Sequence, residues 1–303
     1  MIEKNIIFPT GQKHIKKTSF EGSAFFNVIV MYYLSHKHED CCAVLPNNYQ
    51  PKFDANIHWF NNDGLTHEHD ESCVLLPKHI KHIPDEQTKV SLRWIQKKRK
   101  KSKKNKILTV NNLINDDSDG HISVPLNFWK KFNQCPSKRF VIFPFGFNCI
   151  DSGHANYMLY DRKNKSLERF ESFGKLTNSC LNPPNLDKKI FELFLNNIGP
   201  DSVHYYYPPE SFLPHLNFQA KQENEKEWLN RNEDDEPVGY CAVWSAWYID
   251  LRLSNPEIDR EELVKIAMQK LEKLPTTFTT FIRNYSGLIV EVSKEIKNIY
   301  EKK

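Results

Sequence analysis

One stretch of this chain, from Gly239 to Leu251, reads as a turn that leads directly into a buried helix with a cysteine at its start. Gly239 permits the sharp entry, and the residues after Cys241 are apolar on nearly every side, as in a helix at the centre of a domain. The helix ends before Ser254-Asn255-Pro256, because proline disfavours helical geometry in the residue that precedes it. The Cys241 thiol would face unpaired backbone N–H groups and the positive end of the helix dipole, which favour the thiolate.

Taken alone, that pattern favours a buried structural cysteine, and a hairpin upstream is what favours a nucleophile. Two β-rich runs flank the polar turn 162–165. A turn centred between residues 163 and 164 places Asn156 opposite Glu171, with His154 on the same face and diagonal to Glu171. A carboxylate there can accept the imidazole N–H and leave the other ring nitrogen to a thiol. The alternative is an ordinary half-polar hairpin with a stray histidine.

The order of these residues carries a resemblance. His154, then Glu171 at the end of the next strand, then Cys241 opening a buried helix resembles the ubiquitin-like-modifier proteases and the adenovirus proteinase. The Gly-His-Ala-Asn strand, Glu-Arg-Phe-Glu, and Gly-Tyr-Cys followed by Asp-Leu-Arg-Leu-Ser-Asn-Pro are similar to thiol proteases of amoeba-infecting giant viruses. The resemblance covers residues 120–255 and implies a papain-like cysteine protease core. It makes His154 the general base, Glu171 its orienter and Cys241 the nucleophile. The hairpin register leaves Asn156 as the alternative orienter.

The chain departs from that family before the cysteine. These proteases usually have a glutamine a few residues earlier that supports the oxyanion, and none stands between Pro237 and Cys241. The nearest are Gln219 and Gln222, separated from the cysteine by the acidic segment 223–236, which we expect to be a solvent-facing excursion. We expect Gln219 to return to the site, with Gln222 as the alternative. Backbone N–H groups at the start of the cysteine helix are a further source of donors.

The chain of 303 residues is long enough for one large domain or two smaller ones. We expect four parts: an N-terminal accessory region (1–95), a basic linker (96–119), the cysteine protease core (120–255) and a C-terminal helical extension (256–303). Strands and helices mix within the core, so the predicted fold class is α+β, with the cysteine helix packed on an antiparallel or mixed sheet.

Individual elements of the core follow from local patterns. Residues 139–145 read as a strand, and Pro144 within it favours a sheet edge or a bulge. Apolar residues at helical spacing predict a helix over 186–198, and 203–207 predict a further strand. Two helices follow Pro256, the second of them interrupted or bent near Gly287. Residues 20–34 are apolar and fit either a helix or a pair of strands.

Histidines and cysteines gather in the first third of the chain, but their spacing does not define a zinc site. The repeats His36-Lys-His38 and His67-Glu-His69 lack the regular CxxC pairs of a strong zinc motif. We therefore expect solvated polar loops, with no metal and no cofactor. The cluster comprises His36, His38, Cys41, Cys42, His58, His67, His69, Cys73, His79 and His82.

Charge and hydropathy limit the kinds of partner that we expect for this chain. Eight of the ten residues from Lys97 to Lys106 are basic, which predicts a hydrated loop or linker. Nucleic-acid contact there is the weaker alternative, because no aromatic residue offers a stacking surface. No run of eighteen apolar residues and no secretory pattern occur, so we expect no membrane association. Seven cysteines, an odd number, predict free thiols in a reducing intracellular compartment.

Together these features predict a thiol protease or isopeptidase that acts through a thioester. By the resemblance, its substrate is a protein, either a ubiquitin-like modifier or a viral polypeptide, and its setting is a virion or the host cytoplasm. Two alternatives stay open. The chain is a catalytically inactive protease-fold protein with a structural or binding role in a virion, or an acyltransferase that uses the same dyad.

Overall fold

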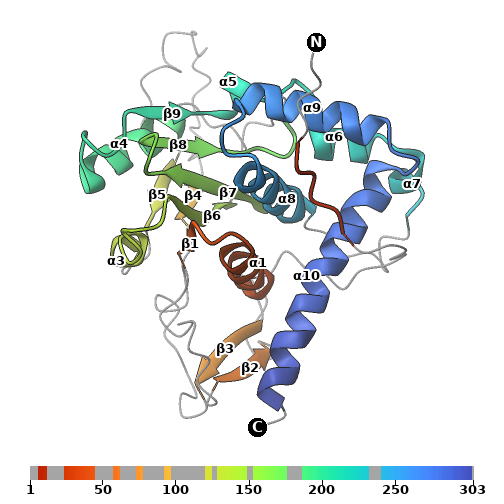
Figure 1. Ribbon diagram of the computed structural model, residues 1–303, viewed down its shortest axis with the longest axis horizontal. Helices are drawn as coiled ribbons and strands as arrows, with labels where there is room; N and C mark the ends of the chain where they lie inside the picture. The colour runs from red at the N-terminus through yellow and green to blue at the C-terminus, as the bar shows by residue number, and fades with distance from the viewer. Residues whose placement is uncertain are drawn as a thin grey trace, which may run out of the picture.

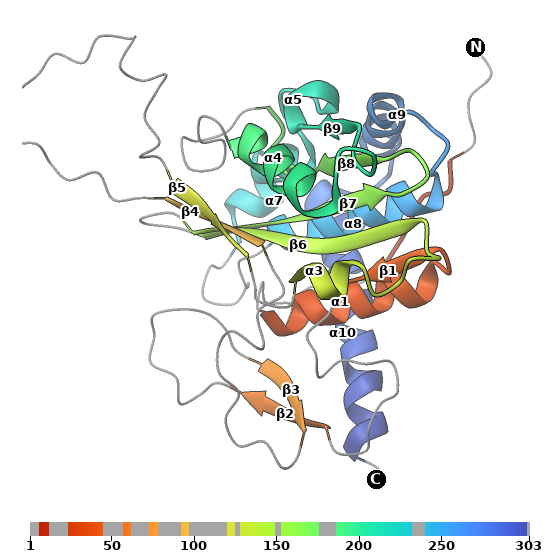
Figure 2. The ribbon, with the colours of Figure 1, turned by 90° about the vertical axis from the view of Figure 1, so that its left-hand side faces the viewer.

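The computed structural model describes residues 6–11, 24–44, 57–61, 73–77, 92–96, 120–124, 128–148, 153–175, 186–231 and 240–301. A seven-stranded mixed sheet forms the centre of the molecule, in the order β5-β4-β6-β7-β8-β9 with β1 also paired to β6 (Figures 1 and 2). Helices lie on its two faces, so the predicted α+β class is confirmed. The strands are β1 Cys41–Ala43, β4 Leu92–Gln96, β5 Gly120–Ser123, β6 Phe140–Asn148, β7 Gly153–Asp161, β8 Ser166–Arg169 and β9 Tyr205–Tyr207, while β2 Ile57–Asn61 and β3 Cys73–Pro77 form a separate antiparallel pair.

The alternation of side chains along the strands divides the interior into two cores. On β6, Phe140 and Ile142 pack with the helices α1 (Ala24–Lys37), α8 (Tyr240–Ser254) and α10 (Phe278–Glu301). Val141, Phe143 and Phe145 instead pack with α3 (Phe128–Phe132) and α4 (Leu186–Ile198). The first core surrounds α8, whose residues from Ala242 to Leu253 are all buried, as the sequence predicted for a central helix.

The N-terminal part of the chain contributes to this same core. Residues 24–37 form the helix α1, which resolves the open choice between a helix and strands. Its residues Ile29, Val30, Met31 and Leu34 are buried beside α8 and α10. Strand β4 lies inside the central sheet. The division into an accessory region 1–95, a linker 96–119, a core 120–255 and an extension 256–303 stays a prediction.

Pro144 lies in the central strand β6, so the expectation of a sheet edge was wrong. Strand β7 pairs with β6 along its whole length, with Pro144 opposite Tyr157. On the other side of β6, β1 pairs with residues 140–142 and β4 with residues 145–148. Pro144 falls between those two partners, where its missing N–H interrupts no ladder hydrogen bond.

The remaining helices are α5 (Pro209–Phe212), α6 (Phe218–Glu223), α7 (Lys226–Leu229) and α9 (Arg260–Glu272). Asp259 caps α9, because its side chain accepts from the backbone N–H groups of Glu261 and Glu262. The helix predicted over 186–198 is confirmed as α4. The last helix, α10, is continuous through Gly287, so the expected interruption is absent there.

The acidic segment before α8 is not the free excursion that the sequence suggested, at least over its described part up to residue 231. Glu225 accepts the backbone N–H groups of Phe278 and Thr279 over 2.7 and 2.9 Å, so it caps the start of α10. Glu227 bonds the side chains of Thr280 and Arg283. Carboxylates at a helix N-terminus satisfy unpaired N–H groups and the positive end of the dipole, and this holds α7 against α10.

The expectation of free thiols was also wrong for two of the seven cysteines. Cys42 on β1 and Cys135, in the turn after α3, form a disulfide across a sequence separation of 93 residues. Cys41 and Cys241 are free among the described cysteines. The disulfide joins β1 to the connection between α3 and β6.

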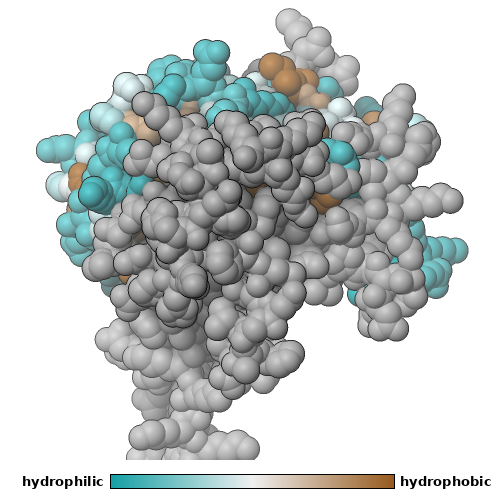
Figure 3. Space-filling model, turned by 90° about the horizontal axis from the view of Figure 1, so that it is seen from below, coloured by the Kyte–Doolittle hydropathy of each residue, from teal (hydrophilic) through white to brown (hydrophobic). Residues whose placement is uncertain are grey.

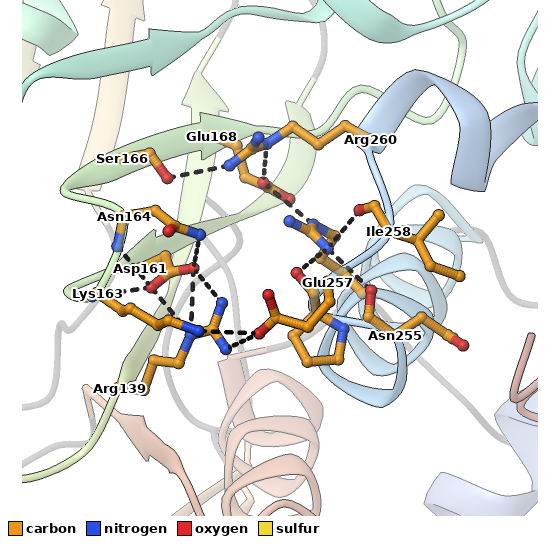
Figure 4. A network of polar contacts seen from close by, with 12 residues as sticks. Arg139, Asp161, Lys163, Asn164, Ser166, Glu168, Asn255, Glu257, Ile258 and Arg260 are labelled. Atoms are coloured by element: carbon orange, nitrogen blue, oxygen red, sulfur yellow. Dashed lines mark hydrogen bonds and ion pairs between the residues drawn. The ribbon is translucent and has the colours of Figure 1, made fainter.

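Buried charges hold the helices onto the sheet. Glu168 on β8 is 2% exposed and accepts from the guanidinium group of Arg260 (Figure 4). It also accepts from Tyr248 of α8 and from the guanidinium group of Arg252. On α8, the carboxylate of Asp250 is fully buried. Its ion pairs and hydrogen bond tie α8 to α1 and α10, through Lys37, His38 and Tyr285.

On the face seen from below, the coloured residues at the surface are mostly hydrophilic, with hydrophobic residues in small separate groups (Figure 3). Among the described residues, the large hydrophobic side chains that are exposed are Ile7, Tyr205, Leu216 and Leu229. Within the same residues, no helix is long and apolar enough to cross a bilayer.

Candidate active site

The hairpin β7–β8 has the register predicted from its turn. Met158 pairs with Arg169 and Asp161 with Ser166, which continues to Asn156 opposite Glu171. The ladder ends at the Met158–Arg169 pair, so the first half of β7 pairs with β6 alone in the described sheet. Glu171 follows β8 at that point, and its side chain reaches the open edge of β7.

Both oxygens of the Glu171 carboxylate are engaged by neighbours on this edge. The Nε2 atom of His154 lies 2.9 Å from Oε1, which also accepts the backbone N–H of Phe173 over 3.1 Å. The side-chain amide of Asn156 donates to Oε2 over 2.9 Å. Glu171 is fully buried. The structure therefore brings together three of the predicted site residues. Glu171 is hydrogen-bonded to the ring of His154, and Asn156 is hydrogen-bonded to Glu171.

Cys241 is the second residue of α8, close to the position that its sequence context predicts. Its thiol is hydrogen-bonded to the side chain of His154 and to the backbone of Ala155. Because Glu171 occupies Nε2, the Nδ1 atom of His154 is left for the sulfur. The side chain of Cys241 is half-buried, whereas His154 is 9% exposed.

The electrostatics of these three groups favour an ion pair. Burial raises the pKa of the Cys241 thiol, but the neighbouring imidazolium and the hydrogen bonds from His154 and Ala155 outweigh it, so the pKa lies below its usual value. Burial also acts to lower the pKa of His154, yet the negative charges of Glu171 and of the thiolate raise it to about 10.

Glu171 itself remains ionised in this setting. Burial works to raise its pKa, and the charge of His154, the hydrogen bond from Asn156 and the charge of Arg169 together lower it below the usual range. Arg169 is fully buried and forms an ion pair with Asp187 at the start of α4. The thiol of Cys241, the imidazole of His154 and the carboxylate of Glu171 therefore lie in sequence along one line of hydrogen bonds.

A second contact connects the carboxylate to the cysteine helix. The hydroxyl of Ser245, one turn after Cys241 on α8, donates to Oδ1 of Asn156 over 3.5 Å. Asn156 is 1% exposed and Ser245 is fully buried. The amide nitrogen of Asn156 thus bonds Glu171, and its amide oxygen bonds Ser245 of α8. Asn156 therefore links the Glu171 carboxylate to the helix that carries the thiol.

The two candidate glutamines both lie on α6, which packs against α8. Gln219 accepts the Ser172 hydroxyl over 2.6 Å and donates to Glu223 over 3.0 Å. Gln222 is fully buried and accepts the indole N–H of Trp244 over 2.6 Å. Its Nε2 atom has no hydrogen-bond partner among the described residues. Gln219 therefore lies beside the residue that follows the acid, and Gln222 lies beside the cysteine helix.

Two further residues at the site were not predicted from the sequence, Ser172 and Asn217. Ser172 follows the acid directly, and its hydroxyl anchors Gln219. Asn217 donates its side-chain N–H to the backbone oxygen of Glu171 over 2.8 Å. An asparagine just before a helix is ordinarily a cap, so the local sequence contains no signal for this contact across 46 positions.

The described part of the chain contains no candidate metal site. No group of three or more His, Cys, Asp or Glu side chains lies close enough together there to hold a metal ion. His38, part of the histidine cluster, pairs with Asp250. His36 bonds the backbone of Tyr32. His67, His69, His79, His82 and the basic block 97–106 lie outside the described residues.

No protein-family model matches the chain. Its sequence is 30% identical over 160 residues to the "Putative ankyrin repeat protein L371" of Acanthamoeba polyphaga mimivirus, a match that covers 51% of this chain and 21% of that protein. The chain thus spans about a fifth of the length of this curated relative.

Three solved structures of bacterial effectors show weak similarity. The Chlamydia trachomatis effector Cdu1 bound to ubiquitin is 12% identical, with a TM-score of 0.30 over 53% of this chain and 64% of that chain. The Chlamydia abortus effector ChlaDUB is 12% identical, with a TM-score of 0.33 over 88% and 99% of the two chains. The Legionella pneumophila effector RavZ in complex with human LC3B is 9% identical, with a TM-score of 0.36 over 97% and 67%. Scores this low establish no shared fold and carry no conclusion about function.

Proposed function

We propose that the protein is a cysteine peptidase or isopeptidase with Cys241 as nucleophile, His154 as general base and acid, and Glu171 as the orienter of His154. One observation carries the proposal. The imidazole of His154 is hydrogen-bonded on one side to the Glu171 carboxylate at 2.9 Å and on the other to the thiol of Cys241 near the start of α8. A nucleophile, a base and an orienting group in this order are what acyl transfer by a thiol requires.

The reaction would proceed in two steps. In the first, the thiolate attacks the carbonyl carbon of an amide, the C–N bond breaks, and the imidazolium of His154 gives its proton to the leaving amine. In the second, His154 takes a proton from water, which attacks the thioester and releases the acid and the free thiol. Glu171 stays ionised throughout and stabilises the imidazolium without accepting its proton.

The tetrahedral intermediate of each step needs hydrogen-bond donors for its oxyanion. We propose the amide of Gln219 as the side-chain donor, with Gln222 as the alternative. Backbone N–H groups at the start of α8 add to either one. Two facts bear on the choice: Gln219 is anchored to Ser172 next to the acid, while Gln222 keeps its Nε2 atom unpaired beside α8.

Asn156 has a supporting role in this proposal, and Glu171 is the orienter. The Nδ2 atom of Asn156 donates to Glu171, and the ring of His154 bonds to Glu171 directly. Asn156 therefore aligns the carboxylate so that its other oxygen faces the imidazole. An orienter that is itself held by a neutral amide keeps its negative charge for the imidazolium.

The substrate we propose is a protein, either a ubiquitin-like modifier or a viral polypeptide, on the strength of the sequence resemblance. From the same resemblance we propose that the protein acts in a virion or in the host cytoplasm.

The test is labelling of the whole chain by a panel of ubiquitin-like C-terminal electrophiles and peptide aldehydes, followed by intact mass and peptide mapping. We expect one adduct, on Cys241, that is absent from the Cys241→Ala and His154→Ala variants. Labelling that persists in Cys241→Ala, or a wild-type chain that no electrophile labels, would contradict the proposal.

A further inference from the structure

The acid of the site lies in a tight turn that is held from outside the hairpin. We call residues Glu171–Gly174 the acid turn. Strand β8 ends at Arg169, before the turn begins, so the ladder with β7 does not fix it. The main chain of the turn is bonded instead by the segment 214–219, which leads into α6.

Hydrogen bonds from that segment reach three of the four backbone oxygens of the acid turn. The side chain of Asn217 donates to the oxygen of Glu171 over 2.8 Å, and its backbone N–H donates to the oxygen of Phe173 over 3.0 Å. The backbone N–H of Gln219 donates to the oxygen of Ser172 over 3.0 Å. Asn217 therefore holds the acid turn at two of its four residues.

The acid turn packs so closely against the segment 214–219 that a side chain at residue 174 would not fit. Gly174 has a φ of +96°, and a Cβ added there would lie 2.5 Å from the oxygen of Pro214 and 2.9 Å from the nitrogen of Asn217. Such distances are well inside van der Waals contact. The acid turn can dock on the segment 214–219 only because this position has no side chain.

The side chain of Asn217 bonds the acid turn and does not cap α6. It occupies the N-cap position of α6, where an asparagine side chain usually accepts an N–H of the first turn. Here it makes no cap hydrogen bond. Its Oδ1 atom is buried without a hydrogen-bond partner, and the residue is fully buried. A buried polar atom without a partner destabilises the fold, so the contact with Glu171 comes at the expense of the cap.

We infer that Asn217 is a positioning residue for catalysis, which holds the acid turn so that the Glu171 carboxylate meets the ring of His154. The inference rests on the proposed function and names a residue that the triad does not include. Asn217 bonds the main chain of Glu171, two bonds from the Cα that carries the carboxylate. Loss of that contact would displace the acid and reduce the ion pair between His154 and Cys241, because misplacement by about 1 Å costs up to roughly 100-fold.

The test uses two variants with residues that suit the N-cap position of α6, Asn217→Ser and Asn217→Gly. Serine is as good an N-cap as asparagine and glycine is tolerated there, yet neither side chain can donate to the oxygen of Glu171 from this position. The readout is the rate of Cys241 alkylation by iodoacetamide at pH 7, followed by peptide mass mapping. We expect both variants to react about tenfold more slowly than the wild type and to unfold within a few degrees of it.

A double-mutant comparison separates positioning from a general structural role. If Asn217 acts through Glu171, Asn217→Ser adds no further loss in a chain that already carries Glu171→Gln. The matched control is Asn224→Ala at the other end of α6, where the side chain also donates to a backbone oxygen, that of Ala220, over 2.8 Å. We expect this control to alkylate at the wild-type rate.

The outcomes are distinct. Wild-type reactivity in Asn217→Ser and Asn217→Gly, or a loss that adds fully to that of Glu171→Gln, would overturn the inference and leave the proposed function standing. A wild-type Cys241 that reacts no faster than glutathione at pH 7 would overturn both.

Discussion

The Nε2 atom of His154 lies 2.9 Å from Oε1 of Glu171, although β8 has ended two residues before the acid. Neighbours from three segments contact these two residues. Asn156 aligns the carboxylate, the segment 214–219 docks the acid turn, and α8 brings Cys241 to the other side of the ring. The site is therefore assembled at the point where the hairpin ladder stops and other elements take over.

Replacement of Glu171 by glutamine should lower turnover by about 100-fold or more. The carboxylate accepts three N–H groups, from His154, Phe173 and Asn156. An amide has a single acceptor oxygen and would set its own NH2 group against at least one of these donors. The measurement is kcat on an amide substrate derived from the electrophile that labels Cys241 best.

The same variant should shift the pH dependence of turnover. Burial acts to lower the pKa of His154, but the negative charges of Glu171 and Cys241 raise it to about 10. The imidazolium is the acid that protonates the leaving amine, so activity is lost as pH rises through this value. Without the negative charge the pKa of His154 falls, and the basic limb moves to lower pH. A basic limb that stays in place, together with a larger loss in Asn156→Ala, would make Asn156 the orienter.

Cys241 should be the fastest-reacting thiol of the folded chain at mildly acidic pH. Its pKa is lowered by His154 despite burial, whereas burial raises the pKa of Cys41 well above its usual value. Limiting iodoacetamide followed by peptide mapping at pH 6 measures both. The His154→Ala variant is the control, in which the advantage of Cys241 should disappear. Equal rates for the two thiols in the wild type would count against a catalytic Cys241.

Alanine substitutions of the two glutamines of α6 should affect different properties, kcat for Gln219 and the melting temperature for Gln222. Gln219→Ala is expected to reduce kcat by ~10²–10³ with little change in melting temperature, as for loss of an oxyanion donor. Gln222→Ala should mainly lower the melting temperature, because it leaves the buried indole N–H of Trp244 without its acceptor. The reversed pattern would assign the oxyanion to Gln222, whose Nε2 atom is unpaired.

Local patterns were enough to predict the elements that carry the site. A polar turn defines a hairpin register, and the observed ladder from Met158–Arg169 to Asp161–Ser166 confirms it. An apolar helix after a glycine predicts α8, because burial on all sides needs no knowledge of the partners. Periods of two and 3.6 residues are properties of the chain alone, so these predictions do not depend on long-range contacts.

What the sequence did not show depends on contacts between distant residues. Pro144 suggests an edge strand by its chemistry, and only the positions of β1 and β4 explain its place in the centre. Glu225 looks like part of a solvated acidic run until α10 places its N-terminus against it. Asn217 has the pattern of a helix cap, and its partner is 46 residues away. Each of these residues serves a partner that local propensity cannot identify.

Reduction of the disulfide between Cys42 and Cys135 should lower the free energy of unfolding by ~2–4 kcal/mol. The bridge closes a long loop, so its loss increases the entropy of the unfolded chain. Urea titrations with and without reductant measure the difference. The Cys42→Ser/Cys135→Ser double variant is the control, since its midpoint should not respond to reductant. Cys241 alkylation should stay near the wild-type rate in the double variant, because the bridge joins β1 to the turn after α3.

Two glycines with similar positive φ values allow a comparison that isolates the docking of the acid turn. Gly174 has a φ of +96° and Gly199 a φ of +86°, so alanine at either position is strained by roughly 1–2 kcal/mol. At Gly199 nothing lies within 4 Å of the added Cβ, whereas at Gly174 the oxygen of Pro214 would lie 2.5 Å away. Gly174→Ala must therefore push the acid turn off the segment 214–219.

We expect Gly199→Ala to lower the melting temperature slightly and to leave Cys241 alkylation unchanged. Gly174→Ala should lower the melting temperature further and slow alkylation about as much as Glu171→Gln does, because the displaced carboxylate no longer meets His154. Thermal unfolding and alkylation at pH 7 on the same samples give both readouts. If Gly174→Ala loses stability but keeps full Cys241 reactivity, the position of the acid turn does not control the ion pair. In that case the hydrogen bond from Asn156 alone would be enough to hold Glu171 on the ring.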